Sequence, residues 1–496
     1  MFGRIRAYWR RRSLEKETLR RRQYAAAQVG RLVGSWMPAY RDVNELIAFA
    51  SPIIRNRTRQ LVRDFPPFCR AVNNIVNFTV GSGVRFQSRM LTPEGEADKP
   101  RRQMIEDRFN AWMDQADVRG KLHFHELQQL AARQDGECGE YLAAVTTPRR
   151  PGRHPFSLQF YEPERLTEAG APFYGQDTII SQGIEFLVET GEPVAYYVAD
   201  EGYGRNALRI DADNILHDFQ TLRPGQIRGI SPFAPAIMIA RDLSDYLQAE
   251  IDAAKLASKW LAFVTVQDAE EFQNLRVDVN GSKVPVEKLE NAIIEYLQPG
   301  EEVKFASHQR PGQNFDPFSR FTLRMVSITV DQPYELLSGD YTGINYTTLR
   351  GIRNDFRQML SPRQYRHELH FSRRILRLWM AREALMHPYD FPGFWLDPSR
   401  YLRGQWIPVG MPEIDPLRET KSAVEAINAG LKSPQEVILA RGGDPDEVLD
   451  QNQDWKAMCE ERGLTFNVAG VSTSLANNPA AVDPDTAESR ALRRVK

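Results

Sequence analysis

Apolar residues recur at helical spacing in the first third of the chain, and the period then changes. Residues 43–78 and 120–135 have apolar positions three and four apart, which predicts helices. The Pro66-Pro67 pair inside the first of these segments marks a break or a helix start. Residues 155–220 instead contain short apolar runs separated by Gly, Pro and Asp, which predicts strands. This part of the chain is therefore expected to mix helices with sheets.

A long helix is predicted next, from Ser231-Pro232 to about residue 262, because one apolar stripe runs along it. We expect this stripe to pack within the chain, to contact a second copy, or to do both. Its members are Ile239, Leu243, Leu247, Ile251, Ala254, Ala257 and Leu261.

The segment after this helix is predicted to be a compact insertion, followed by further helices. Residues 263–312 contain strand-like runs and one short helical pattern. A second helix is expected at 315–330, then a polar loop, and then a helical region from Thr347 to Met386 that is interrupted at Pro362. Two helices would therefore flank a small mixed module.

The remainder of the chain has a different pattern. The region from residue 413 predicts two short helices, the first closed by Gly430 and the second opened by the Ser433-Pro434 pair. Beyond Gly463 the chain is rich in Ala, Asn, Pro, Asp and Ser, which predicts disorder.

Composition narrows the class of protein. The chain has 496 residues, of which 42% are hydrophobic and 26% charged, enough for several domains with a buried core. Its formal net charge of −1 argues against tight, non-specific DNA binding, because Lys and Arg that neutralise phosphates supply such affinity. The first 22 residues are an exception, with eight arginines and two glutamates. We expect this arm to be a solvated tail or to contact nucleic acid or a scaffold protein.

Targeting signals and disulfides are not expected. No apolar run approaches the roughly 18 residues that cross a bilayer, and the basic N-terminus lacks the apolar core of a signal peptide. The isolated cysteines, Cys69, Cys138 and Cys459, do not indicate a disulfide framework. They fit synthesis in a reducing cytoplasm.

Enzyme motifs are missing from the chain. The phosphate-binding pattern GxxxxGK[ST] does not occur, and neither does GxSxG, so an ATPase or a hydrolase is not supported. His123 and His125 suit a metal less well than a helix N-terminus, and His217-Asp218 lacks a nucleophile partner. On the long helix, Lys255 and Lys259 lie one turn apart, where they would either line a passage for phosphates or simply be exposed. Neither a cofactor nor a metal is expected.

Several short runs, in this order, resemble the lambda-type portal proteins of tailed bacteriophages. The similarity extends over about residues 40 to 465 and depends on the order and collective spacing of the runs. The matching runs are 61–67, 80–84, 135–137, 183–185, 191–196, 215–219, 223–231, 297–301, 345–350, 429–433 and 443–448.

The resemblance implies an α+β portal fold with a mixed wing domain, a stem of two helices, a small α/β clip and a short helical crown, assembled as a ring. It divides the chain into a basic N-terminal arm, 1–39; wing, 40–230; first stem helix, 231–262; clip, 263–312; second stem helix, 313–332; tunnel loop, 333–346; wing and channel-bordering helices, 347–412; crown, 413–465; and disordered tail, 466–496.

The function implied by the resemblance is that of a portal, a dodecameric ring at the capsid vertex of the virion through which DNA is packaged and ejected. An external ATPase would drive the duplex, and the ring would guide it passively. Expected partners are further copies of the chain, double-stranded DNA in transient contact, the large terminase subunit, head–tail connector proteins, the major capsid protein and scaffold. The alternative is a minor capsid or head-completion protein that acts structurally.

The resemblance and the charge pattern together assign candidate surfaces. A loop without Lys or Arg would contact passing DNA weakly, because each neutralised phosphate adds affinity and therefore drag. The tunnel-loop candidates are Ser338, Gly339, Asp340, Tyr341, Thr342 and Gly343. The acidic clip candidates for docking terminase and connector are Glu287, Glu290, Glu295, Glu301 and Glu302.

Overall fold

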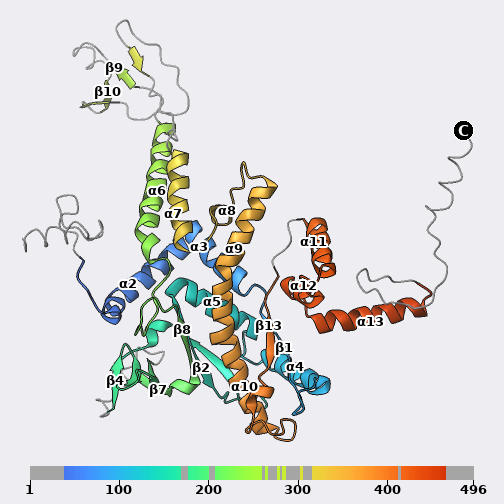
Figure 1. The fold of residues 1–496 in the computed structure, drawn as a ribbon. Coiled ribbons are helices and arrows are strands. Elements are labelled where there is room, and N and C mark those ends of the chain that lie inside the picture. Colours follow the sequence, from blue (N-terminus) through green and yellow to red (C-terminus); the bar gives the residue numbers. More distant parts are fainter. Residues whose placement is uncertain are drawn as a thin grey trace, which may run out of the picture.

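The computed structural model describes residues 38–168, 177–199, 207–259, 315–410 and 415–464, together with four short strands between 263 and 304. It is a mixed structure of helices and sheets. A broad body is built from both, and two long helices rise from it side by side toward the four short strands (Figure 1).

The N-terminal part of the body is helical, as predicted for residues 43–78. Helix α2 spans Val43–Asp64 and α3 spans Pro66–Thr79. They separate at Phe65, whose extended backbone suits a residue that precedes proline. The Oδ1 atom of Asp42 accepts hydrogen bonds from the Asn44 and Glu45 amides and so caps α2.

Two more helices cover the sheets. Helix α5, Phe124–Cys138, confirms the predicted helix at 120–135 and extends it by three residues. Helix α4, Lys99–Met113, was not predicted, although its main apolar residues lie four, three and one positions apart, which is helical spacing. Four of its side chains are buried, Ile105, Phe109, Trp112 and Met113.

The predicted β-rich region forms two antiparallel sheets. The three-stranded sheet has the order β3-β2-β8, and the four-stranded sheet has the sequential order β4-β5-β6-β7. A separate pair joins β1 to β13 from the far end of the chain. The strands are β1, Arg85–Ser88; β2, Glu140–Thr146; β3, Ser157–Tyr161; β4, Thr178–Ser181; β5, Ile184–Leu187; β6, Pro193–Ala199; β7, Ala207–Asp211; β8, Ile215–Phe219; and β13, Gly404–Ile407.

An aromatic core holds the body together. Trp112, Phe124 and Trp379 are almost fully buried, and the Phe109 ring lies edge-on to Trp379 with centroids 5.0 Å apart. Trp406 on β13 packs against the same cluster. Because these rings come from the first and last parts of the body, the long-range pairing of β1 with β13 is fixed by side-chain packing as well as by the ladder.

The two rising helices are α6, Ile237–Lys259, and α7, Phe315–Thr329. The start predicted at Ser231 is wrong by six residues: Phe233 is buried, and the backbone from Ala234 to Ala236 forms a 3₁₀ turn. The predicted stripe is only partly correct. Leu243 is buried at the base, but Ile251, further along, is 49% exposed. The base packs against α2 and α3 through a second apolar cluster.

The interruption predicted at Pro362 does not occur there. Helix α9, Tyr346–His367, continues through this proline, which lies on its exposed side. The irregularity comes later, as a π-helical turn over Glu368–Ser372 that leads into α10, Arg373–Met386. A proline removes one backbone donor, and the rest of a long packed helix can offset that loss.

The C-terminal region contains three helices, where two were predicted. They are α11, Pro416–Asn428; α12, Pro434–Ala440; and α13, Pro445–Glu461. The predicted cap at Ser433 is confirmed, since Ser433 and Glu436 form a reciprocal capping box. The third helix was missed because few apolar residues mark it, although Asp444 and Pro445 give it a standard N-terminus.

The buried His367 at the end of α9 predicts a dependence of stability on pH. Burial, and to a smaller degree Arg366, lowers the pKa of His367 to about 4, although Asp135 acts in the opposite direction. The unfolded chain has a histidine pKa of about 6.5. Between these values only the unfolded chain takes up the proton. This contribution to stability is therefore complete above pH 6.5 and is lost as the pH falls toward 4.

We expect His367→Gln to flatten the acid limb of the stability curve. The parent should lose up to about 3 kcal/mol between pH 6.5 and 4 through this residue, because each unit of pKa difference corresponds to about 1.4 kcal/mol. Urea unfolding at a series of pH values gives the free energy of unfolding of each protein. The difference between the two proteins isolates His367, because the titrations that they share cancel. If the free energy of unfolding fell equally steeply with decreasing pH in parent and variant, the assignment of this pH dependence to His367 would be contradicted.

Candidate channel loop and docking surfaces

The predicted tunnel loop begins as a helix. Helix α8 covers Tyr334–Ser338, so Ser338 is a helical residue and the loop proper starts at Gly339. Gly339 has a φ of 73°, the left-handed conformation that ends a helix and that glycine adopts without strain. The expected loop over 333–346 is thereby shortened to the segment between α8 and α9, which lies beside α7, with Asp340 3.6 Å from Arg320 (Figure 1).

Local hydrogen bonds give this loop a defined shape. The amide of Asp340 donates to Ser338 Oγ at 3.1 Å, and the amide of Thr342 donates to Asp340 Oδ1 at 3.0 Å. The hydrogen bonds from Thr342, and then the Arg320 guanidinium on α7, hold the pKa of Asp340 below its ordinary value. Asp340 is therefore a charged residue that also shapes the loop. Tyr341, Thr342 and Gly343 are exposed.

Of the two candidate channel lysines, only Lys255 has a side chain among the described residues. Lys255 is exposed on α6, and its Nζ atom lies 3.1 Å from Asp252 Oδ1. Lys259 is the last residue of α6, and its side chain lies outside the described residues. Since Asp242 and Asp245 are also exposed on this helix, its outer face carries both signs of charge.

An exposed apolar face runs along α7, where the sequence analysis identified none. Four large side chains on this helix are between 38% and 67% exposed. Their spacing of three, four and three residues places them on one side of the helix. We call this set the α7 stripe; it consists of Phe318, Phe321, Met325 and Ile328. The spacing was visible in the sequence, but spacing alone does not distinguish a core face from an exposed one.

The acidic clip candidates fall mostly outside the described residues. Glu302 lies on strand β12, Glu302–Lys304, and is opposite Thr265 of β9, Phe263–Thr265. The other two strands form a hairpin, β10, Arg276–Val279, with β11, Ser282–Pro285. Glu287, Glu290, Glu295 and Glu301 lie outside the described residues.

A buried ionic cluster centred on Glu140 joins the helical and sheet parts of the body. Glu140, at the start of β2, is fully buried and receives charged donors from two directions. Arg228 forms a bidentate pair with it, with its Nη2 atom 2.7 Å from Oε1 and Nε 2.9 Å from Oε2. Arg55 of α2 donates to Oε1 at 2.8 Å. His217 Nε2 lies 3.2 Å from Oε2.

The contacts of Arg228 and its neighbours give a structural reason for the run 223–231, one of the runs that resemble the portal proteins. The Gly229 amide donates to Glu140 Oε2 at 2.8 Å. A Cβ atom at Gly229 would lie 2.3 Å from the carbonyl oxygen of Gly139, so only glycine fits there. The run therefore has a structural role: it completes the hydrogen bonding of a buried carboxylate. The signal for this role in the sequence is Arg228, a charged residue between the apolar Ile227 and Gly229.

The cluster keeps Glu140 ionised. Burial alone would raise its pKa, but the Arg228 charge and the hydrogen bond from His217 outweigh burial and hold the pKa of Glu140 well below its usual range. The resulting contribution to stability is complete above the unfolded-state value of about 4.3 and is lost only as the pH falls toward the lower folded-state pKa. His217 thus has the structural role that was favoured for it.

The other candidate sites for chemistry have structural explanations. The side chain of His123 caps α5 and forms a capping box with Glu126. Nowhere in the described ranges do three or more His, Cys, Asp or Glu side chains gather so that they could hold a metal ion. All three cysteines are free, as expected. None of the described helices combines the length and the apolar character that crossing a membrane requires.

Comparison with known proteins gives the family. Residues 29–364 match the family described as phage portal protein, lambda family. The chain belongs to this family. The structural features described above for this portal-family chain are an ordered loop, an exposed apolar helix face and a buried ionic cluster.

Individual relatives within the portal family are distant. The probable portal protein of Halomonas phage phiHAP-1 is 25% identical over 457 residues, which cover 88% of this chain and 86% of that protein. Portal protein B of Escherichia phage lambda is 23% identical over 298 residues, or 53% of this chain and 56% of that protein. A chain in the virion of a native gene transfer agent particle is 16% identical, with a TM-score of 0.44 over 84% of this chain and 97% of that chain.

Proposed function

We propose that identical copies of this chain close into a dodecameric ring at the capsid vertex of a virion and that duplex DNA passes through its centre. Membership in the portal family supports a portal role, and the α7 stripe supports the ring. A row of exposed large apolar side chains is unfavourable in water and is typical of an interaction surface. A ring needs two complementary surfaces on every subunit, and the α7 stripe supplies one of them.

The ring is testable through the α7 stripe. We expect Phe321→Asp with Ile328→Asp to raise the concentration needed for assembly at least about tenfold, because burial of each such side chain contributes about 1.5–3 kcal/mol. Mass photometry and negative-stain images of the purified chain give particle mass and shape. Val188→Asp, at an equally exposed apolar residue away from the stem, is the matched control and should assemble normally.

The images also separate this proposal from a head-completion role. A portal shows annular particles with a central hole. If the parent chain stayed monomeric at high concentration, with no annular species even beside scaffold and coat proteins, the ring proposal would have to be abandoned.

The channel is proposed to guide DNA without gripping it. Between Gly339 and Asn345 the loop carries no Lys or Arg, and its one charged side chain, Asp340, is negative and engaged in local hydrogen bonds. Contacts of this kind repel phosphates weakly and release few counterions, so they add little drag. Lys255 and Lys259 would contribute at most a limited attraction, since Lys255 is paired with Asp252.

The segment between α6 and α7 is proposed to dock the large terminase subunit during packaging and the head–tail connector proteins afterwards. Its position at the far end of two long helices supports this role, because it places the segment away from the body (Figure 1). The five glutamates from Glu287 to Glu302 would suit basic partner surfaces. The wing and the basic arm 1–39 are proposed to meet the major capsid protein and scaffold.

A further inference from the structure

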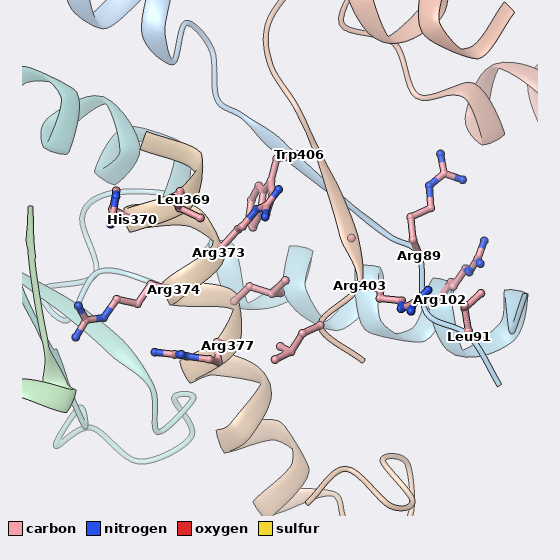
Figure 2. Close-up of a pocket in the computed structure, with 13 residues that line it drawn as sticks. Arg89, Leu91, Arg102, Leu369, His370, Arg373, Arg374, Arg377, Arg403 and Trp406 are labelled. Carbon is pink, nitrogen blue, oxygen red and sulfur yellow. The ribbon is translucent and has the colours of Figure 1, made fainter. Parts of the chain in front are cut away.

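A second surface of the body is strongly basic and has not been assigned a role above. A cavity of about 770 Å³ lies between α10 and the β1–β13 pair. Figure 2 shows arginines on α10 to one side of Trp406 and arginines of the opposite wall to the other side, while Arg374 turns away to donate to the Ala212 carbonyl oxygen at 3.0 Å. Leu376 and Leu402 make the floor of the cavity partly apolar, and none of its lining residues is acidic. We call it the arginine groove; its arginines are Arg89, Arg102, Arg373, Arg374, Arg377 and Arg403.

The charges of the arginine groove are only partly neutralised within the chain. Arg89 pairs with Asp446 at 2.9 Å, and Arg373 pairs with Glu368 at 2.7 Å. Within the part of the chain that the structure describes, Arg377 and Arg403 form no ion pair. So many guanidinium groups around one hollow create a positive potential that favours an anionic occupant.

The apolar floor favours an amphipathic acidic segment over a phosphate backbone, which offers no apolar side chains to cover Leu376, Leu402 and Trp406. Neither end of the chain itself is suitable. The first 22 residues are strongly basic, and residues 465–496 contain three acidic and four basic side chains. An acidic segment must therefore come from a helix of the chain or from another protein.

Helix α13 has the required chemistry. Among its 17 residues only Pro445 and Cys459 are buried, which leaves little packing to stabilise the helix. Four of its six acidic residues recur at intervals of four, four and seven, which places these four on one face. Leu449, 58% exposed, and Met458, 42% exposed, flank that face on either side. We call this face the acidic stripe; it consists of Asp446, Asp450, Asp454 and Glu461.

Only the first turn of the acidic stripe contacts the groove of its own chain. This turn is held at the groove's rim, where Arg85 lies 3.7 Å from Glu447 and Arg89 pairs with Asp446. From there the helix runs outward past α4 (Figure 1). Asp450 and Asp454 line a cavity of about 1570 Å³ between α13 and the body. In the described structure neither of these two forms an ion pair across it.

We propose that the arginine groove of one subunit receives the acidic stripe of α13 from the adjacent subunit. This inference rests on the proposed ring. A helix on one side of each subunit and a groove elsewhere on it make a head-to-tail contact, the kind that closes rings by rotation. Opposite charges would set the register of the contact, and Leu449 and Met458, on opposite sides of the acidic stripe, would contact the two sides of the groove.

Two charge-reversed variants test the contact. The groove variant carries Arg377→Glu and Arg403→Glu, and the helix variant carries Asp450→Lys and Asp454→Lys. In a ring made of either variant alone, like charges face one another at every contact. The protein concentration at which half of the chains are assembled should therefore rise at least about tenfold. An equimolar mixture should assemble as the parent does, because in an alternating ring every groove then faces a helix of opposite charge. Mass photometry measures all three samples.

The controls keep the outcomes distinct. Circular dichroism checks that each variant is folded, and Arg149→Glu with Arg150→Glu reverses two exposed arginines elsewhere and should assemble normally. If both variants assemble alone as the parent does, the contact is wrong and the ring stands. If the groove variant assembles normally but loses affinity for a short DNA duplex, the groove is a nucleic-acid site and the contact is wrong. If the parent forms no ring, both proposals fail.

Discussion

Glu140→Ala is expected to lower the free energy of unfolding by about 3–5 kcal/mol, the usual cost of removing one partner from a buried ion pair. Arg55 and Arg228 are both almost fully buried, and without the carboxylate their charges would lie close together with no counter-charge. The Gly229 amide would also lose its acceptor. Thermal and urea unfolding of parent and variant measure the change.

Two comparison variants sharpen this result. Asp316→Asn removes the partner of Arg320 in an exposed pair and should lower the free energy of unfolding far less than Glu140→Ala, because solvent screens exposed charges. Replacing Glu140, Arg55 and Arg228 together by Leu, Met and Met should recover part of the loss, because no charge is then left unpaired. Recovery should be incomplete, since Arg228 also donates to the carbonyl oxygens of Gln182 and Pro163. A stability of Glu140→Ala within about 1 kcal/mol of the parent would refute the cluster's role.

Asp340→Arg is expected to slow DNA packaging at least about threefold at low salt and to delay DNA release, because the change adds about two positive charges per copy beside the duplex. The effect should shrink as salt rises, since released counterions drive such binding. A packaging assay with empty particles, motor and ATP, followed by a release assay with the filled particles, measures both features over a range of salt concentrations.

The control for this variant separates charge from loop shape. Asp340→Asn keeps an oxygen that can accept the hydrogen bond from the Thr342 amide but removes the charge. Its packaging rate should stay within about twofold of the parent, because it adds no attraction for phosphates. If Asp340→Arg packaged and released DNA at the parent's rate at every salt concentration, the loop would not contact DNA.

The sequence was sufficient to predict most of the helices and strands but not which of their surfaces stay exposed. Residues 43–78 and the β-rich segment were predicted correctly because apolar periodicity reports which side chains face a core. Helix α4 carries the same periodicity in Ile105, Phe109 and Trp112 and was therefore predictable, and these side chains are buried in the same core as α10. The interruption predicted at Pro362 was wrong, because the free-energy cost of a proline inside a helix depends on the surrounding structure. The sequence does not show that structure.

The candidate surfaces were harder to predict than the fold. Asp340 was identified by its place in a polar loop, but its hydrogen bonds to Thr342 and its proximity to Arg320 needed coordinates. The α7 stripe and the arginine groove were missed for a common reason. Each depends on which side chains remain exposed after folding, and the groove also joins Arg89 to Arg377, almost three hundred residues apart in the sequence.

The pairing of β1 with β13 has a consequence for synthesis. While the ribosome is still making the middle of the chain, Arg85–Ser88 has no strand partner, because Gly404–Ile407 emerges only much later. Trp379 and Trp406 are likewise absent from the aromatic core until then. A nascent subunit therefore displays a bare strand edge and unfilled apolar surface for most of its translation, which is a hazard for aggregation. Completion of the body near residue 407 would ensure that only finished subunits are recruited into an assembly.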